Sequence, residues 1–149
     1  MFSEIACYGQ DSTFDDILTT IFISAEQNVN CVALPSGFMG RVVDFLKDQR
    51  FSAVIDFPYG ISTTQVRLHE IILAIRHGAN LIDLVLNGSY LKEENWKKIE
   101  EDLKVCSTVC NENNITLRPI LEYKLFSPKV VIKACEMLEK YNITTVINS

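Results

Sequence analysis

The sequence of 149 residues lacks the features of membrane proteins, nucleic-acid-binding proteins and secreted proteins. It has no apolar run of about 18 residues, so we expect no membrane span. Its formal net charge of -5 and its pI near 5.0 argue against nucleic acid as a general partner. Its first residues, MFSEIACYGQDS, lack the basic and apolar regions of a signal peptide. These absences predict a cytoplasmic protein.

Histidine is scarce, and the number of cysteines is odd. The sequence holds 2 histidines and 5 cysteines. Scattered cysteines at mostly apolar positions indicate free thiols in a reducing compartment. Cys106 and Cys110 share a predicted helix face, but neither histidine lies near them in the sequence. We therefore predict no metal site and no cofactor.

Residues 51–87 form the unit around which the chain is organised. Residues 51–57 (FSAVIDF) are almost continuously apolar, which is typical of a strand buried on both faces. A predicted helix follows, and residues 81–87 (LIDLVLN) are a second apolar strand that contains Asp83. A buried acid is costly unless it is paired or used, so functional residues should lie near Asp83.

The rest of the chain repeats this alternation without a linker or a change in composition. Strands are predicted at residues 4–8, 30–34, 51–57, 81–87, 116–122 and 144–149. The stretch 88–95 is predicted to be a loop. With a repeat of about 30 residues, this pattern indicates one parallel α/β domain over 1–149. A complete β/α barrel needs about 250 residues, so about six strands and five helices predict an incomplete barrel of the TIM type.

A doubly wound sheet also fits the repeat, but no Gly-x-Gly-x-x-Gly follows the first predicted strand. Helix starts are predicted from capping-box spacing at Ser12 with Asp15 and at Ser62 with Gln65. The expected buried stripe of the helix after Ser62 is Val66, Leu68, Ile71, Ile72 and Ile75.

A series of short motifs runs from the third predicted strand to the fourth. In chain order they are Phe57-Pro58-Tyr59-Gly60, Glu70, Ala74, Gly78-Ala79 and Ile82-Asp83-Leu84-Val85. Their order resembles that of the deoxyribose-phosphate aldolases, and the likeness covers most of residues 15–149. The resemblance implies a β/α barrel. It also implies reversible cleavage of 2-deoxyribose 5-phosphate to glyceraldehyde 3-phosphate and acetaldehyde, through a Schiff base on a lysine.

The resemblance places the catalytic aspartate of the family at Asp83, its Schiff-base lysine at Arg118 and its second lysine at Asn148. A Schiff-base nucleophile must be a neutral amine, and a guanidinium does not lose its proton in a protein. Asn148 carries no charge that could lower the pKa of a neighbouring amine. Lys124 could substitute, with Glu122 beside it, but a solvated lysine with a pKa of about 10.4 is a poor nucleophile.

Two functions remain open. The first, which we favour, is a catalytically inactive homologue that serves as a structural or interaction subunit of a larger assembly. The alternative is an active Schiff-base aldolase or lyase acting on 2-deoxyribose 5-phosphate or a related sugar phosphate. Its site would be rebuilt from Lys124, Glu122 and Asp83, or completed by another chain. Unpaired sheet edges predict a homo-oligomer or a protein partner.

Strand alternation makes a geometric prediction about Asp83 and Arg118. Arg118, Ile120 and Glu122 share one face of their strand, and the other face is purely apolar. Arg118 should therefore point into the barrel, towards Asp83. It could bind a small anionic ligand there, but we favour an ion pair with Asp83, with Asn148 close enough to hydrogen-bond one of the two.

Overall fold

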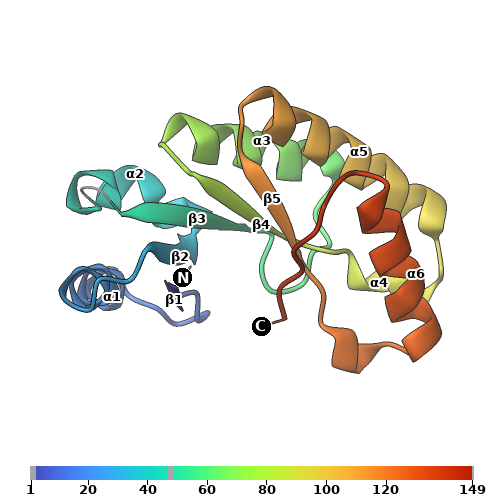
Figure 1. Ribbon diagram of the computed structural model, residues 1–149, viewed down its shortest axis with the longest axis horizontal. Coiled ribbons are helices and arrows are strands. Elements are labelled where there is room, and N and C mark those ends of the chain that lie inside the picture. The colour runs from blue at the N-terminus through green and yellow to red at the C-terminus, as the bar shows by residue number, and fades with distance from the viewer. Residues whose placement is uncertain (1–2, 47–48, 149) are drawn as a thin grey trace.

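The computed structural model describes residues 3–46 and 49–148 (Figure 1). Its described part contains a five-stranded parallel sheet in the order β1-β2-β3-β4-β5. The strands are β1 (Glu4–Ala6), β2 (Cys31–Pro35), β3 (Arg50–Ile55), β4 (Leu81–Val85) and β5 (Thr116–Ile120). Each strand pairs with its neighbour in the sequence, which is the topology predicted for a barrel-like chain.

Helices connect the strands. They are α1 (Phe14–Glu26), α2 (Met39–Val42), α3 (Thr64–Arg76), α4 (Gly88–Lys92), α5 (Trp96–Glu112) and α6 (Pro128–Glu139). Short 3-10 turns are η1 (Ser36–Phe38), η2 (Val43–Phe45) and η3 (Tyr123–Leu125). The prediction of a loop at 88–95 was wrong over α4. The Asn87 side chain accepts a hydrogen bond from the Tyr90 amide, and the burial of Leu91 holds this short helix in place.

The two faces of the sheet are unequal. Strand residues of the outer face, such as Leu34, Ile82 and Leu117, belong to the large core that also contains the buried residues of the helices. The inner face has only a small separate cluster of Ala33, Val54, Val85 and Ile120, with Tyr8, Phe57 and Ile147 against it. Helices therefore cover one face of the sheet, as in a β/α barrel, and the barrel-like prediction is confirmed.

The sixth strand, predicted at 144–149, is reduced to a single β-bridge between Ile120 and Ile147. The Leu121 amide donates to the Ile147 carbonyl at 2.8 Å, and the Ile147 amide donates to the Pro119 carbonyl at 2.8 Å. Residues 144–146 are exposed and do not pair with β5, so the pairing does not extend into a longer strand. Residue 149 lies outside the described residues.

The predicted helix caps were displaced by one residue. Thr13 accepts a hydrogen bond from the Asp16 amide and starts α1, and Thr63 accepts one from the Val66 amide and starts α3. Ser62 is not available as a cap because its hydroxyl donates to Asp56 at 2.8 Å. The predicted stripe of α3 was also partly wrong, since its buried residues are Arg67, Ile71 and Ala74, whereas Val66 is exposed.

Candidate functional site

Asp83 and Arg118 face each other on the inner side of the sheet. Asp83 on β4 is the register partner of Arg118 on β5. The Arg118 Nε donates to Asp83 Oδ1 at 2.7 Å, and its Nη2 donates to Asp83 Oδ2 at 2.9 Å. Asp83 is 2% exposed and Arg118 is 5% exposed. The predicted ion pair is therefore confirmed, in the two-pronged geometry that planar guanidinium and carboxylate groups favour.

Glu4 is a third member of this group, and sequence reasoning missed it. Its carboxylate accepts a hydrogen bond from Arg118 Nη2 at 2.6 Å, although Glu4 lies on β1. We call Glu4, Asp83 and Arg118 the inner triad. The sequence did contain a signal for Glu4, because it is an acid in the short and otherwise apolar first strand. Asn148 follows Ile147 and is exposed, and its hydrogen bond to the triad stays a prediction.

The charges of the inner triad are set by burial and by one another. Burial raises the pKa of the Asp83 carboxyl, and the hydrogen bonds from Arg118 oppose this rise. Burial disfavours the charge on Arg118, but both carboxylates outweigh it and raise its pKa. Burial, followed by the charge of Glu4, raises the pKa of the nearby Cys31 thiol to about 12. The arginine therefore stays protonated, and this thiol is no nucleophile.

Glu122 and Lys124 lie where β5 ends. Glu122 precedes η3 and is half-buried, and Lys124 within η3 is exposed. The Lys124 Nζ lies 6.0 Å from the centre of the Tyr123 ring. Among the described residues, no hydrogen bond or ion pair joins Lys124 to Asp83. The structure thus brings Asp83 and Arg118 together and leaves Lys124 on the rim.

A second buried arginine lies on the other side of the sheet. Arg67 on α3 is 1% exposed, and its Nε lies 3.3 Å from the Asp56 carboxylate at the end of β3. Its guanidinium also contacts Asp102 of α5 and donates to the Val85 carbonyl. We call Asp56, Arg67 and Asp102 the outer triad. It fixes the β3–α3 loop to α5 and to the end of β4. The sequence did contain a signal for the burial of Arg67, because Arg67 lies at helical spacing from Ile71 and Ala74.

Comparison with known proteins identifies the family. The model of the DeoC/LacD family aldolases matches residues 5–142. The chain belongs to this family. It is 33% identical over 125 residues to the deoxyribose-phosphate aldolase of Mycoplasmopsis pulmonis, covering 83% of this chain and 56% of that one. The enzyme of Mannheimia succiniciproducens is 33% identical over 100 residues, which cover 67% of this chain and 44% of that one.

Solved structures agree on the fold. The tetrameric deoxyribose phosphate aldolase of Aeropyrum pernix superimposes with a TM-score of 0.88 at 17% identity, covering 98% of this chain and 62% of that one. At this identity the likeness concerns the fold alone. The chain spans about half the length of the curated relatives that it matches. All three residues of the inner triad lie within the part of the family fold that this chain spans.

Two of the cavities that lie beyond the ends of the strands differ in the chemistry of their lining. The first, which we call the apolar mouth cavity, has a volume of about 280 Å³. It lies between the loops after β3, β4 and β5. Its walls include Ile61, Val85, Ile120, Leu125 and Phe126, and Glu122 is the only charged residue among the described residues that line it.

The second cavity, the polar mouth cavity of about 490 Å³, lies over the ends of β1, β2 and β3. Asp56 and Glu70 are the charged residues of its described lining, together with the hydroxyls of Tyr8, Ser12 and Ser36. The Ser36 hydroxyl donates to Glu70, and burial raises the pKa of the Glu70 carboxyl.

No group of three metal-ligating side chains occurs in residues 3–46 and 49–148. Within the same residues, no helix is long and apolar enough to cross a membrane.

Proposed function

We propose that this chain is a non-catalytic member of the DeoC/LacD aldolase family that serves as a structural or interaction subunit. The observation that carries the proposal is the state of Arg118, at the position where the aldolase resemblance puts the Schiff-base lysine. Its guanidinium is buried and held by both Asp83 and Glu4. An arginine so held cannot attack a carbonyl carbon.

The composition of the sheet supports the same proposal. None of the five described strands contains a lysine. A Schiff base inside the barrel requires a side-chain amine on an inward-facing position. Beside the apolar inner cluster, the inward-facing positions of this sheet include Glu4, Asp83 and Arg118, and Arg118 is the cation of the inner triad.

Trapping with borohydride tests the absence of catalysis. The purified chain is incubated with 2-deoxyribose 5-phosphate and sodium borohydride, and its mass is measured. We expect no adduct and no aldehyde release above background, whereas the M. pulmonis relative treated in parallel serves as the positive control. A reduced adduct on any lysine would refute the non-catalytic proposal, and peptide mapping would locate it.

The competing function is a working aldolase that uses Lys124 with Glu122 and Asp83. One observation favours it: Lys124 and Glu122 lie at the carboxyl ends of the strands, where β/α barrels place their active sites. An adduct that is lost in Lys124→Ala would support this reading. An adduct formed only after a second protein is added would indicate a site completed by another chain.

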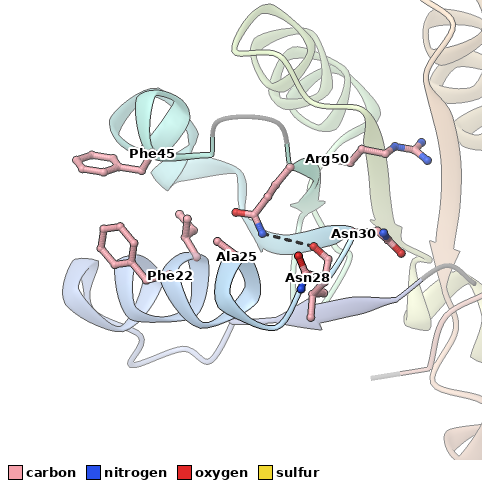
Figure 2. A pocket seen from close by; sticks show the side chains of 9 residues that line it. Phe22, Ala25, Asn28, Asn30, Phe45 and Arg50 are labelled. Carbon is pink, nitrogen blue, oxygen red and sulfur yellow. Dashed lines mark hydrogen bonds between the residues drawn. The ribbon is translucent and has the colours of Figure 1, made fainter.

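An exposed apolar face supports the proposed role in an assembly. Phe22 on α1 is 52% exposed and Phe45 in η2 is 40% exposed, and their rings meet edge to face with centres 6.4 Å apart (Figure 2). They lie at one end of a cavity of about 550 Å³ between α1 and the start of β3. Exposed aromatic side chains grouped in this way are common at protein interfaces.

We propose that this face, formed by Phe22, Phe45 and the cavity beside them, takes part in a homo-oligomer or a larger complex. The relative from A. pernix is a tetramer. Sedimentation at micromolar concentration should show association, which Phe22→Ser weakens. Ile132→Ser on α6 is a matched control, because Ile132 is 59% exposed and lies outside this face. A monodisperse monomer would contradict the proposal.

A further inference from the structure

The apolar mouth cavity has aliphatic and aromatic walls that come from several segments of the chain. Val85 and Ile120 line it from the ends of β4 and β5, and both belong to the small inner cluster. Ile61 lines it from the loop between β3 and α3. Leu125 and Phe126 line it from the segment between β5 and α6. A ligand in this cavity would therefore meet mainly apolar surface.

The loop between β3 and α3 holds its side of the cavity in a fixed position. The Gly60 amide donates to the Asp56 carbonyl at 2.8 Å, and the Asp56 carboxylate accepts hydrogen bonds from the Ser62 amide at 2.9 Å and from the Ser62 hydroxyl at 2.8 Å. Arg67 of the outer triad lies 3.3 Å from the same carboxylate. Gly60 packs so closely that an added Cβ would lie 2.8 Å from the Leu86 carbonyl oxygen. This loop cannot fill the cavity without breaking these contacts.

The segment after β5 is held in a similar way. The Leu125 amide donates to the Glu122 carbonyl at 2.9 Å, and the Phe126 amide donates to the Tyr123 carbonyl at 3.2 Å. Because both segments are fixed by hydrogen bonds, the cavity is preformed, and a ligand need not order the loops when it binds. Preformed cavities lined by Leu, Ile and Phe bind small apolar molecules.

The rim of the cavity exposes apolar side chains to water. Tyr59 is 67% exposed, Ile61 is 63% exposed and Leu125 is 67% exposed, and all three line the cavity. Single exposed apolar residues are ordinary, but a group of them around one cavity indicates a binding site. A ligand in the cavity would remove part of this surface from water, which favours binding.

The charges near the cavity do not select a ligand of either sign. Glu122 is the charged residue of its described lining, and it already takes part in an interaction within the protein. An adjoining cavity of about 380 Å³ shares Leu125 and Phe126 with the apolar mouth cavity. The charged residues of its described lining are Lys92 and Glu93, which have opposite signs. These surroundings favour an uncharged ligand over the sugar phosphates of the aldolases.

We infer that the apolar mouth cavity binds a small uncharged aromatic molecule, with its ring among Ile61, Ile120 and Phe126. The ring of Phe126 favours an aromatic ligand, because pairs of rings attract each other beyond the burial of their surfaces. Since a cavity of about 150 Å³ accepts benzene, the volume of about 280 Å³ suits a molecule of two rings such as indole. The inference does not rest on the proposed function, since binding does not require catalysis.

Titration with a set of related probes tests the inference. The isotopically labelled chain is titrated at pH 7 with indole and with its charged analogues tryptamine, a cation, and indole-3-acetate, an anion, and amide shifts are followed by NMR. Indole should shift the amides of residues that line the cavity. Each charged analogue should bind about threefold to tenfold more weakly, because its charge would lie near apolar surface.

Two further probes test the kind of ligand. Camphor is an uncharged aliphatic molecule of similar size, and it should bind more weakly than indole because it lacks an aromatic ring. N-acetyltryptophanamide represents a tryptophan side chain of a protein partner, and it should also bind more weakly, since its two amide groups would lie against the apolar rim.

Three variants locate the binding. Ser89→Phe, at an exposed position of α4 that lines the cavity, places a ring at its edge and should abolish the shifts caused by indole. Leu125→Ser removes apolar wall surface and should weaken the binding of indole about threefold to tenfold. Ile132→Ser on α6 is the matched control and should leave the affinity unchanged, because Ile132 is exposed and does not line the cavity. The melting temperature of each variant shows that it is folded.

Several outcomes would overturn the inference. Tighter binding of tryptamine or indole-3-acetate than of indole would show that charge selects the ligand. Tighter binding of camphor would exclude the aromatic preference, and tighter binding of N-acetyltryptophanamide would indicate a protein partner instead. The inference would also fail if indole shifted no residue of the cavity, or if it bound Ser89→Phe and Leu125→Ser as it binds the wild type.

Discussion

The inner triad predicts that its two buried partners contribute unequally to stability. Arg118→Met leaves Asp83, which is 2% exposed, without its cation. Removing one partner of a buried pair costs about 3–5 kcal/mol. Asp83→Leu leaves Arg118 still paired with Glu4 at 2.6 Å, so it should cost less. We expect about 1.5–3 kcal/mol for the lost hydrogen bonds to charged groups.

The double variant provides the sharper measurement. In Asp83→Leu with Arg118→Met, two apolar side chains replace the pair, and the Glu4 side chain, which is 22% exposed, can be hydrated. Its stability should lie within about 1.5 kcal/mol of the wild type, because apolar replacements of buried pairs are often neutral. The two single losses should therefore fail to add by at least about 3 kcal/mol.

Urea unfolding followed by circular dichroism gives the four free energies, by linear extrapolation to water. The exposed pair Lys98–Glu101, whose charged atoms are 2.8 Å apart, is the matched control and should show no measurable coupling. Additive losses in the double variant, or a larger loss in Asp83→Leu than in Arg118→Met, would refute the reasoning.

Three further predictions concern the outer triad and the mouth. Arg67→Met should destabilise the fold by about 3–5 kcal/mol in urea unfolding, because it leaves buried carboxylates unpaired; a loss like that of a surface substitution would contradict this. Gly60→Ala should lower the melting temperature, since Gly60 has φ 64° and a Cβ there would lie 2.8 Å from the Leu86 carbonyl oxygen, whereas Gly37→Ala meets no atom within 4 Å. Burial raises the pKa of Glu70 above its ordinary 4.5, so its contribution to stability is present below pH 4.5 and lost as the pH rises through the raised value. The wild type should thus lose stability relative to Glu70→Gln as the pH rises above 4.5 in urea unfolding, and a constant difference would contradict this.

The sequence sufficed to predict the strand order and the Asp83–Arg118 pair. Side chains alternate strictly along a strand, so the apolar set around Arg118 determined which face it occupies. The pairing of Asp83 with Arg118 then followed, because each of the two consecutive strands contains one charged residue and the two charges are opposite. The family resemblance could also be recognised from local sequence, because its motifs lie within one strand–helix–strand unit.

Other features depended on contacts that no local pattern encodes. Glu4 joins Arg118 from a strand 114 residues earlier. Arg67 was overlooked because an arginine was not counted in the apolar stripe, although two carboxylates and a carbonyl make its burial possible. The segment 144–149 has the composition of a strand, but among its described residues Ile147 alone forms a bridge to β5.

The contact between Glu4 and Arg118 also bears on the order in which the sheet assembles. Each pair of neighbouring strands closes a loop of about 30 residues, but Glu4 and Arg118 are 114 residues apart. Closing the longer loop directly from the unfolded chain costs only about 1 kcal/mol more, yet the two side chains meet only when all intervening strands are in place. The contact should therefore form last, and its loss should release β1 alone. In hydrogen exchange, Glu4→Gln should speed the exchange of β1 amides and leave those of β4 protected.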